Sequence, residues 1–179
     1  GLAPWRTHVR RLLADRAHVL PAAQEKLLAL ASPLTESPGT LFFTLTQSDL
    51  EYPAVIGEDG EAVTITPARF EAARTSLDRG YRARAYESFF GVFAAHEHTL
   101  AALYGAQTQA NLFLARARGH ESALAAALDE HDIPTAVYHN LVGVVGQSLE
   151  PLHRWTALKQ SVLGLTRFHD YDNLVTLFP

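Results

Sequence analysis

The sequence predicts a mainly α-helical protein, a long-helix array with one small β-hairpin inserted near residues 51–66. Apolar residues recur every three or four positions in residues 22–31 and, over a longer stretch, in residues 80–118, as on one face of a helix. Residues 52–66 instead hold two short β-branched runs around an Asp-Gly turn signal. There is no cysteine, so a disulfide framework is excluded.

The first predicted element is helical and covers residues 1–37. Pro21 is placed early enough to lie in the first turn of a helix. A proline is tolerated there, because the first N–H groups of a helix have no intrahelical partner. Pro33 and the triplet Ser37-Pro38-Gly39 predict the boundary of this segment. The next run, residues 41–50, is short and apolar, and it fits either a helix or a buried strand.

A hairpin and a helix start are predicted next. Residues 52–56 and 62–66 read as strands joined by the turn 57–60. Thr66 followed by Pro67 is typical of a helix N-cap and first helical position. Residues 80–118 then read as one long helix, which Gly91 and Gly105 could bend, because glycine weakens a helix interior and permits close packing of another helix.

Three further helical segments follow: residues 121–130, 133–145 and 149–163. A length of 179 residues lies above the usual size of one domain and below two. We therefore expect a single helical segment over 1–179, with sub-segments 1–66 (N-terminal helices and hairpin) and 67–179 (long-helix bundle).

Composition excludes several function classes. A net charge of −4 disfavours nucleic-acid binding by electrostatics. The concentrated arginines share their stretch with acidic residues, which is typical of a solvated, salt-bridged face; they are Arg69, Arg74, Arg79, Arg82 and Arg84. No apolar run approaches the ~20 residues that span a bilayer, and no signal-peptide pattern is visible, which favours a cytoplasmic location. The chain begins with Gly1 and lacks methionine, which indicates a piece of something longer.

Nine histidines raise the question of a metal site, but the motifs are incomplete. A metallopeptidase helix needs H-E-x-x-H, because histidines four residues apart share one helical face. His96-Glu97-His98 puts its histidines two apart, and His120-Glu121 is followed by Leu124 where the second histidine should stand. The clusters Glu130-His131-Asp132 and His169-Asp170-Tyr171-Asp172 are richer, yet such groups most often decorate a helix end or loop.

No serine-nucleophile motif or phosphate-binding loop is present either. The residues therefore assign no catalytic, cofactor-binding or metal-ligating position, and by themselves they predict a helical domain without a complete active site.

Read as a whole, residues 6–172 resemble oligoendopeptidase F, in the thimet-oligopeptidase-like family of zinc peptidases. The order and spacing of short matches carry this resemblance: Trp5-Arg6, His18-Val19-Leu20, Gln24-Glu25-Lys26-Leu27-Leu28, Ser48-Asp49-Leu50-Glu51-Tyr52, Thr64-Ile65-Thr66, Ser76-Leu77-Asp78-Arg79, Arg82, Ala85-Tyr86, Ala115-Arg116-Ala117-Arg118-Gly119-His120-Glu121-Ser122, Ile133-Pro134, Val137-Tyr138, Leu141, Leu152-His153-Arg154-Trp155, Leu163-Gly164-Leu165, His169 and Tyr171-Asp172.

The resemblance implies an α-helical clamshell around a deep channel, in which one zinc ion hydrolyses short peptides. The family's zinc ligands, the two histidines of H-E-x-x-H and a later glutamate, lie further along its chain than Asp172. The resemblance therefore implies zinc in the parent enzyme and none bound by this chain, which is expected to be inactive alone. Its helices would form one wall of the bowl. Tyr171, Asp172 and the Glu121 region are candidates for lining the channel. The favoured interpretation is that they pack between helices and cap helix ends.

A wall of such a bowl would bury its apolar face against the missing half. Phe89, Phe90 and Phe93 occupy both sides of one predicted helix, which is more than a one-sided stripe requires. The expected partner is therefore the missing C-terminal catalytic half or another copy of the chain, with no nucleic acid or membrane. The alternative is a free-standing helical scaffold or interaction protein derived from the same fold, without enzymatic activity.

Overall fold

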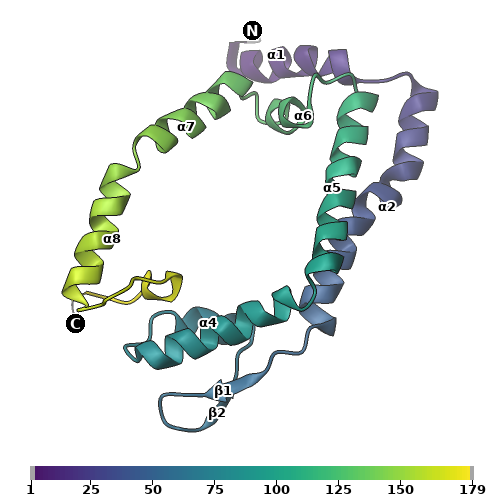
Figure 1. Cartoon of the computed structure of the whole chain (residues 1–179). Coiled ribbons are helices and arrows are strands. Elements are labelled where there is room, and N and C mark those ends of the chain that lie inside the picture. The colour runs from purple at the N-terminus through teal and green to yellow at the C-terminus, as the bar shows by residue number, and fades with distance from the viewer. Residues whose placement is uncertain (1–2, 178–179) are drawn as a thin grey trace. The chain divides into compact units, whose positions relative to one another are not determined.

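The computed structural model describes residues 3–177 and confirms a mainly helical chain with one small antiparallel sheet (Figure 1). Residues 1 and 2 of the predicted first segment lie outside this range. The described elements are η1 (Ala3–Trp5), α1 (Arg6–Asp15), η2 (Arg16–His18), α2 (Ala22–Thr44), the π-helical turn η3 (Leu45–Asp49), β1 (Ala54–Ile56), β2 (Ala62–Thr64), α3 (Pro67–Ala73), α4 (Arg79–Ala94), α5 (Glu97–Ala117), α6 (Ala123–Asp129), α7 (Thr135–Gln147), α8 (Glu150–Val162) and η4 (Asp170–Asp172).

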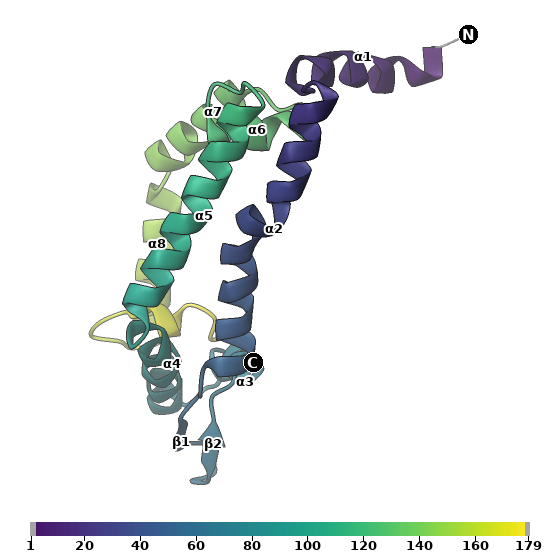
Figure 2. The same ribbon diagram turned by 90° about the vertical axis from the view of Figure 1, so that its right-hand side faces the viewer.

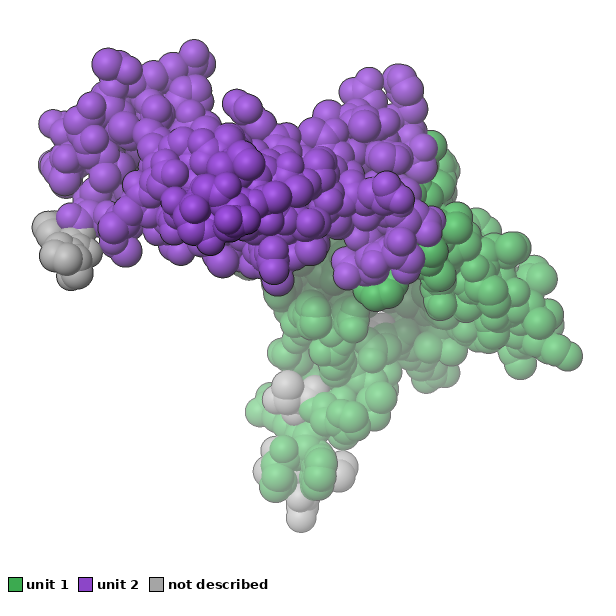
Figure 3. Space-filling view, turned by 90° about the horizontal axis from the view of Figure 1, so that it is seen from below, with its two compact units in different colours: residues 1–44, 101–144 green, residues 45–100, 145–179 purple. Residues whose placement is uncertain are grey.

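The chain folds as two compact units, each built from two separate stretches of sequence (Figure 3). Unit 1 comprises residues 1–44 and 101–144, and unit 2 comprises residues 45–100 and 145–179.

Helix α2, in unit 1, corrects the predicted boundary at Pro33 and residues 37–39, because it continues through both prolines to Thr44. A proline within a helix leaves the carbonyl four residues earlier without its usual N–H donor. For Pro38 that carbonyl belongs to Leu34, and the Ser37 hydroxyl donates to it at 2.9 Å. A neighbouring side chain thus replaces the missing bond, which makes the proline tolerable at this position. Figure 2 shows the course of α2 between α1 and the segment that leads to the hairpin.

The predicted hairpin is confirmed in unit 2. Strand β1 pairs with β2 in antiparallel register, with Val55 opposite Val63. Gly60 has a φ of 84°, in the left-handed region that favours glycine, as the Asp-Gly turn signal requires. The predicted helix start is also confirmed, since the Thr66 side chain accepts a hydrogen bond from the Arg69 amide and Pro67 begins α3.

The core of unit 2 lies where the hairpin and α3 meet α4. It consists of four buried residues with partly buried side chains packed around them: Ile65, Phe70, Ala73 and Ala85, then Val55, Val63, Tyr81, Tyr86 and Phe89. Phe89 stacks on Phe70 with ring centroids 4.2 Å apart, whereas Phe90 is 43% exposed. The Phe90 ring also meets the buried Phe70 ring edge-on, with centroids 5.5 Å apart. Helix α4 therefore covers the core with clustered aromatic rings, of which Phe90 stays partly in contact with solvent.

The predicted single helix over residues 80–118 is wrong, because the structure breaks it between α4 and α5 and not at either glycine. The ring Nδ1 of His96 lies 2.8 Å from the Val92 carbonyl, which can only accept, so the ring donates. That carbonyl would have been the partner of the His96 amide in a continuing helix. The His96 amide bonds instead to Phe93, three residues back. A side chain that competes for a backbone carbonyl thus ends α4.

Unit 1 buries few side chains. Among its described residues only Leu28, Pro38 and Ala115 are buried, while large apolar side chains of α2 and α7 remain exposed, among them Leu27, Leu30, Leu34, Val137, Leu141 and Val142. Across residues 3–177, no helix combines the length and the apolar character needed to cross a bilayer.

Candidate functional site

The nearest approach to a peptidase helix is not a metal site. In His96-Glu97-His98 the His96 ring donates a hydrogen bond to the Val92 carbonyl. The side chains of His98 and Glu97 are 98% and 72% exposed, and their closest N–O distance is 3.8 Å. The three side chains therefore do not converge.

The cluster Glu130-His131-Asp132 forms the end of α6. The Asp132 amide bonds to the Asp129 carbonyl, and the Ile133 amide bonds to the Leu128 carbonyl. Asp132 has a φ of 54°, so it occupies the left-handed position of a Schellman cap. Its carboxylate pairs with Arg10 at 2.7 Å in an exposed ion pair. This cluster caps a helix, as its sequence favoured.

Within the cluster at 169–172, Asp172 forms ion pairs with Arg79 and Arg82. We call these three residues the Asp172 clamp. Asp172 is fully buried and accepts hydrogen bonds from Arg79 at 3.0 and 3.1 Å and from Arg82 at 2.8 Å. Arg82 is also buried, and it donates to the carbonyls of Tyr171 and Ser76. The clamp therefore fixes η4 against α4 by charge and by backbone contacts together.

Two opposing effects act on the pKa of Asp172. Burial favours the neutral acid and would raise the pKa, but the hydrogen bonds from Arg79, Arg82 and the His169 amide hold it below its usual value. The carboxylate is thus ionised at neutral pH. A fully buried carboxylate that is ionised at neutral pH suits a structural role and is poorly placed for proton transfer.

Two of the three remaining predicted arginines, Arg74 and Arg84, also make polar contacts within unit 2. Arg74 pairs with Glu71 at 3.0 Å, and Arg84 donates to the Ile56 carbonyl while lying 3.8 Å from Asp78. Arg69 is exposed on α3. Opposite charges alternate on this surface, as the sequence indicated.

A group that sequence patterns did not single out lies in unit 1, where His18 of η2, His120 of the turn after α5 and Asp129 of α6 come together. One potential ligand atom of each lies within 4.8 Å of the other two. The two imidazole rings stack with centroids 3.7 Å apart. Burial lowers the pKa of the His120 ring, and the neighbouring His18 adds to this effect. His18 appeared in the sequence only as part of the family resemblance, because no local motif links residues a hundred positions apart.

The charge beside this group is balanced. Arg118 is paired with both carboxylate oxygens of Glu25, at 2.8 and 3.0 Å. The Arg118 bond is the largest cause that lowers the pKa of Glu25, and the Leu20 amide adds a second bond. The start of α2 is thereby tied to the end of α5.

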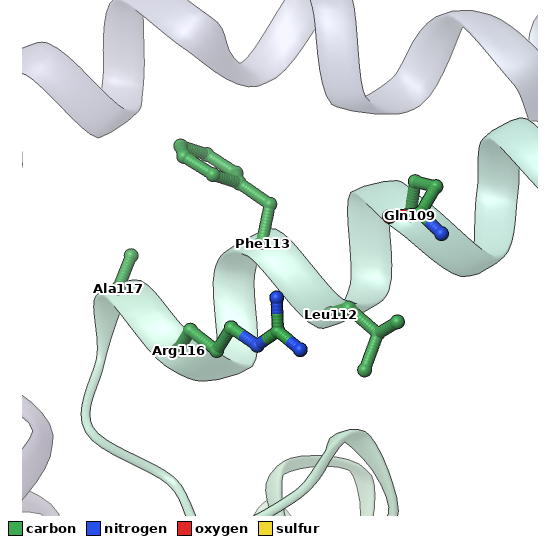
Figure 4. Close-up of a pocket in the computed structure, with 5 residues that line it drawn as sticks. All are labelled: Gln109, Leu112, Phe113, Arg116 and Ala117. Carbon is green, nitrogen blue, oxygen red and sulfur yellow. The ribbon is translucent and has the colours of Figure 1, made fainter.

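The surface of α5 carries an open hollow of about 390 Å³ near its C-terminus (Figure 4). Its lining residues come from two turns of the same helix: Gln109, Leu112, Phe113, Arg116 and Ala117. The hollow lacks converging polar groups and offers apolar contact area with one cation at its edge.

The donor groups do not fit the zinc site that the family resemblance implies. H-E-x-x-H is absent from the 179 residues, and His96, His98 and His120 do not reproduce its spacing on one helix. No step of peptide hydrolysis is therefore assigned to residues of this chain.

Comparisons with known proteins agree on a family. The chain is 33% identical over 162 residues to an oligoendopeptidase F homolog of Lactococcus lactis, and 33% identical over 164 residues to oligopeptidase PepF of Bacillus subtilis. These matches cover 90% and 92% of this chain but only 27% and 24% of the relatives. The chain thus spans about a quarter of the length of the curated relatives it matches.

The fold agrees as well. The crystal structure of oligoendopeptidase-F from Enterococcus faecium superposes with a TM-score of 0.91 at 32% identity, covering 98% of this chain and 34% of that one. A family model described as Oligopeptidase F matches residues 1–52, and one described as Peptidase family M3 matches residues 73–174. The chain therefore belongs to peptidase family M3, as part of an oligoendopeptidase F-like protein.

Proposed function

We propose that this chain is a non-catalytic helical portion of a zinc-dependent oligoendopeptidase that hydrolyses short peptides, and that its helices form part of the substrate-channel wall. One observation carries the proposal: nearly the whole chain matches a quarter to a third of peptidases of this family, yet it lacks H-E-x-x-H. The zinc site would then lie in another part of the parent enzyme.

The exposed apolar faces support a covering partner. In unit 2, large apolar side chains on α8 stay in contact with water, among them Leu152, Trp155 and Leu158. Contiguous faces of this kind rarely stay bare in a free protein. The proposed partner is the remaining catalytic part of the enzyme, and a second copy of this chain is the other candidate.

A chimera tests the proposal. This chain replaces the matching segment of the Enterococcus faecium oligoendopeptidase-F, and hydrolysis of an internally quenched short peptide is followed with zinc present. We expect activity in the chimera and none in the chain alone. The matched control changes the glutamate of the host's H-E-x-x-H motif to glutamine, which should abolish activity. Cleavage by the chain alone, or a folded, zinc-loaded chimera that is inactive, would contradict the proposal.

The alternative is a free-standing scaffold without enzymatic activity. The gene sequence beyond this chain distinguishes it from the peptidase proposal. If the reading frame after the codon for Pro179 encodes H-E-x-x-H and then a glutamate on a later helix, the peptidase proposal holds. A stop codon at that point favours the scaffold or a split subunit. A cytoplasmic location belongs to the same proposal, and cell fractionation tests it.

A further inference from the structure

We propose that His18, His120 and Asp129 form a site for a divalent transition-metal ion of the zinc class, separate from the catalytic zinc of the family. Two imidazoles and one carboxylate are a donor set that Zn²⁺ accepts, with a fourth position left for water. The proposal departs from the sequence-based expectation that this chain binds no metal, and it does not depend on the proposed peptidase role.

The backbone holds two of the three donors in place. Helix α5 ends in a Schellman motif, in which Gly119 has a φ of 71° and the His120 amide bonds to the Ala115 carbonyl at 2.9 Å. Asp129 is the last residue of α6, and its carbonyl accepts the Asp132 amide of the second Schellman cap. Both donors therefore project from helix ends whose backbone is fixed by hydrogen bonds.

The third donor is oriented by a hydrogen bond that suits a metal ligand. Nδ1 of His18 lies 2.9 Å from the Arg118 carbonyl oxygen. Because a carbonyl oxygen only accepts, Nδ1 carries the proton, and the lone pair of the neutral ring is on Nε2. Metal-binding histidines usually have this arrangement, with the second ring nitrogen donating to a carbonyl or carboxylate.

The charges around the group allow a cation to enter. Arg118, two residues before His120, is paired with Glu25. Asp129 also borders a hollow lined by Arg10 and Arg11 together with Asp15 and Asp132. Within residues 3–177, no hydrogen bond or ion pair engages the Asp129 carboxylate. Two neutral imidazoles and this carboxylate would give the site a charge of −1 before the metal binds.

Metal binding requires one local movement. The donors of a tetrahedral zinc ion lie about 3.3 Å apart, whereas these three lie within 4.8 Å of one another. The rings are also nearly parallel, at 13°, so a single ion cannot lie in both ring planes. Rotation of the half-buried His120 ring about its Cβ–Cγ bond would break the stack and turn a nitrogen toward Nε2 of His18.

Titration with Co²⁺, which gives visible bands when bound tetrahedrally, tests the site on the 179-residue chain. We expect one equivalent to bind with these bands and to be displaced by Zn²⁺. Asp129→Asn removes the anionic ligand with little change in shape, and His120→Phe keeps an aromatic stacking partner. Each should weaken binding at least about tenfold. His98→Ala, at a solvent-exposed histidine outside the group, is the matched control and should bind as the unmodified chain does.

Far-UV circular dichroism establishes that each variant is folded. The proposal is overturned if the folded chain shows no saturable Co²⁺ band, or if Asp129→Asn and His120→Phe bind as tightly as the His98→Ala control. Neither result bears on the peptidase proposal, because no step of this experiment measures peptide hydrolysis.

Discussion

Replacement of Asp172 by asparagine is the sharpest test of the Asp172 clamp. The substitution keeps the size of the side chain and removes its charge. Arg82, of which only 3% of the side chain is exposed, would then be a buried cation without a counter-ion. Its hydrogen bonds to the Tyr171 and Ser76 carbonyls, at 2.9 and 2.7 Å, would remain.

The expected cost follows from burial. Removing one partner of a buried ion pair costs about 3–5 kcal/mol, because the other charge stays desolvated. Arg79 is 40% exposed and can turn to water, and Arg82 keeps two carbonyl partners, so we expect the lower end, about 3 kcal/mol. That is a large share of the ~5–15 kcal/mol that stabilises a typical domain.

Hydrogen–deuterium exchange measures this loss of stability in the segments that form the Asp172 clamp. We expect faster exchange in peptides covering residues 79–90 and 168–175 of Asp172→Asn. Asp170→Asn is the matched control, because Asp170 lies in the same turn and is exposed, and among the described residues its carboxylate bonds only to the Asn173 side chain. A surface change of this kind should alter stability by less than about 0.5 kcal/mol. Equal exchange in the two variants would refute the reasoning.

The clamp also predicts an acid-dependent loss of stability. The pKa of Asp172 in the folded chain lies below the unfolded value of about 3.9. Its contribution is therefore complete above that unfolded pKa and is lost as the pH falls through the folded pKa. Urea unfolding of Asp172→Asn should lack this part of the acid dependence. Parallel curves for the variant and the unmodified chain would count against an ionised, paired carboxylate.

Three smaller perturbations test other contacts. Burial lowers the pKa of Lys159, and the nearby Arg82 adds to this effect. As the pH approaches about 10, the unfolded chain therefore binds more protons than the folded chain, and the free energy of unfolding should rise with pH. Urea unfolding should show a smaller rise in Lys159→Met. Gly60→Ala places a Cβ at a left-handed turn residue and should lower the free energy of unfolding by about 1–2 kcal/mol in the same assay, whereas an unchanged value would mean that the turn differs. Gly91→Ala should stabilise the isolated chain by about 0.5–1 kcal/mol, since a Cβ there meets no heavy atom of the described residues within 4 Å, and a destabilised chimera would indicate a helix packed on Gly91.

The elements that sequence predicted well are those set by local chemistry. The hairpin follows from the turn signal at Gly60, and the start of α3 follows from Thr66 and Pro67. The wrong helix boundaries arose where a side chain donates a hydrogen bond to a backbone carbonyl in place of a backbone amide. Ser37 satisfies the carbonyl that Pro38 leaves free, so α2 continues, and His96 takes the Val92 carbonyl, so α4 ends. Neither outcome follows from helix propensity or from apolar periodicity.

The side-chain clusters at Asp172 and His18 were harder to predict because their members are distant in sequence. Asp172 meets Arg79 and Arg82 across some 90 residues, and His18 meets the Arg118–His120 turn across 100. Local spacing correctly excluded H-E-x-x-H but could not bring such groups together. The family resemblance supplied the identity of the fold without assigning a site to any residue.

Helix α7 shows why a covering partner is the central question for this chain. It has 13 residues, and helices shorter than about 12–15 residues are marginal in water. Apart from the half-buried Thr135, all of its residues are exposed, including Leu141 and Val142. Burial of each large aliphatic side chain would add about 1.5–3 kcal/mol, so a partner would decide whether α7 is folded. If a second copy supplies that partner, protection of the α7 amides rises with protein concentration. If the catalytic part of the same polypeptide supplies it, the chimera protects these amides at every concentration.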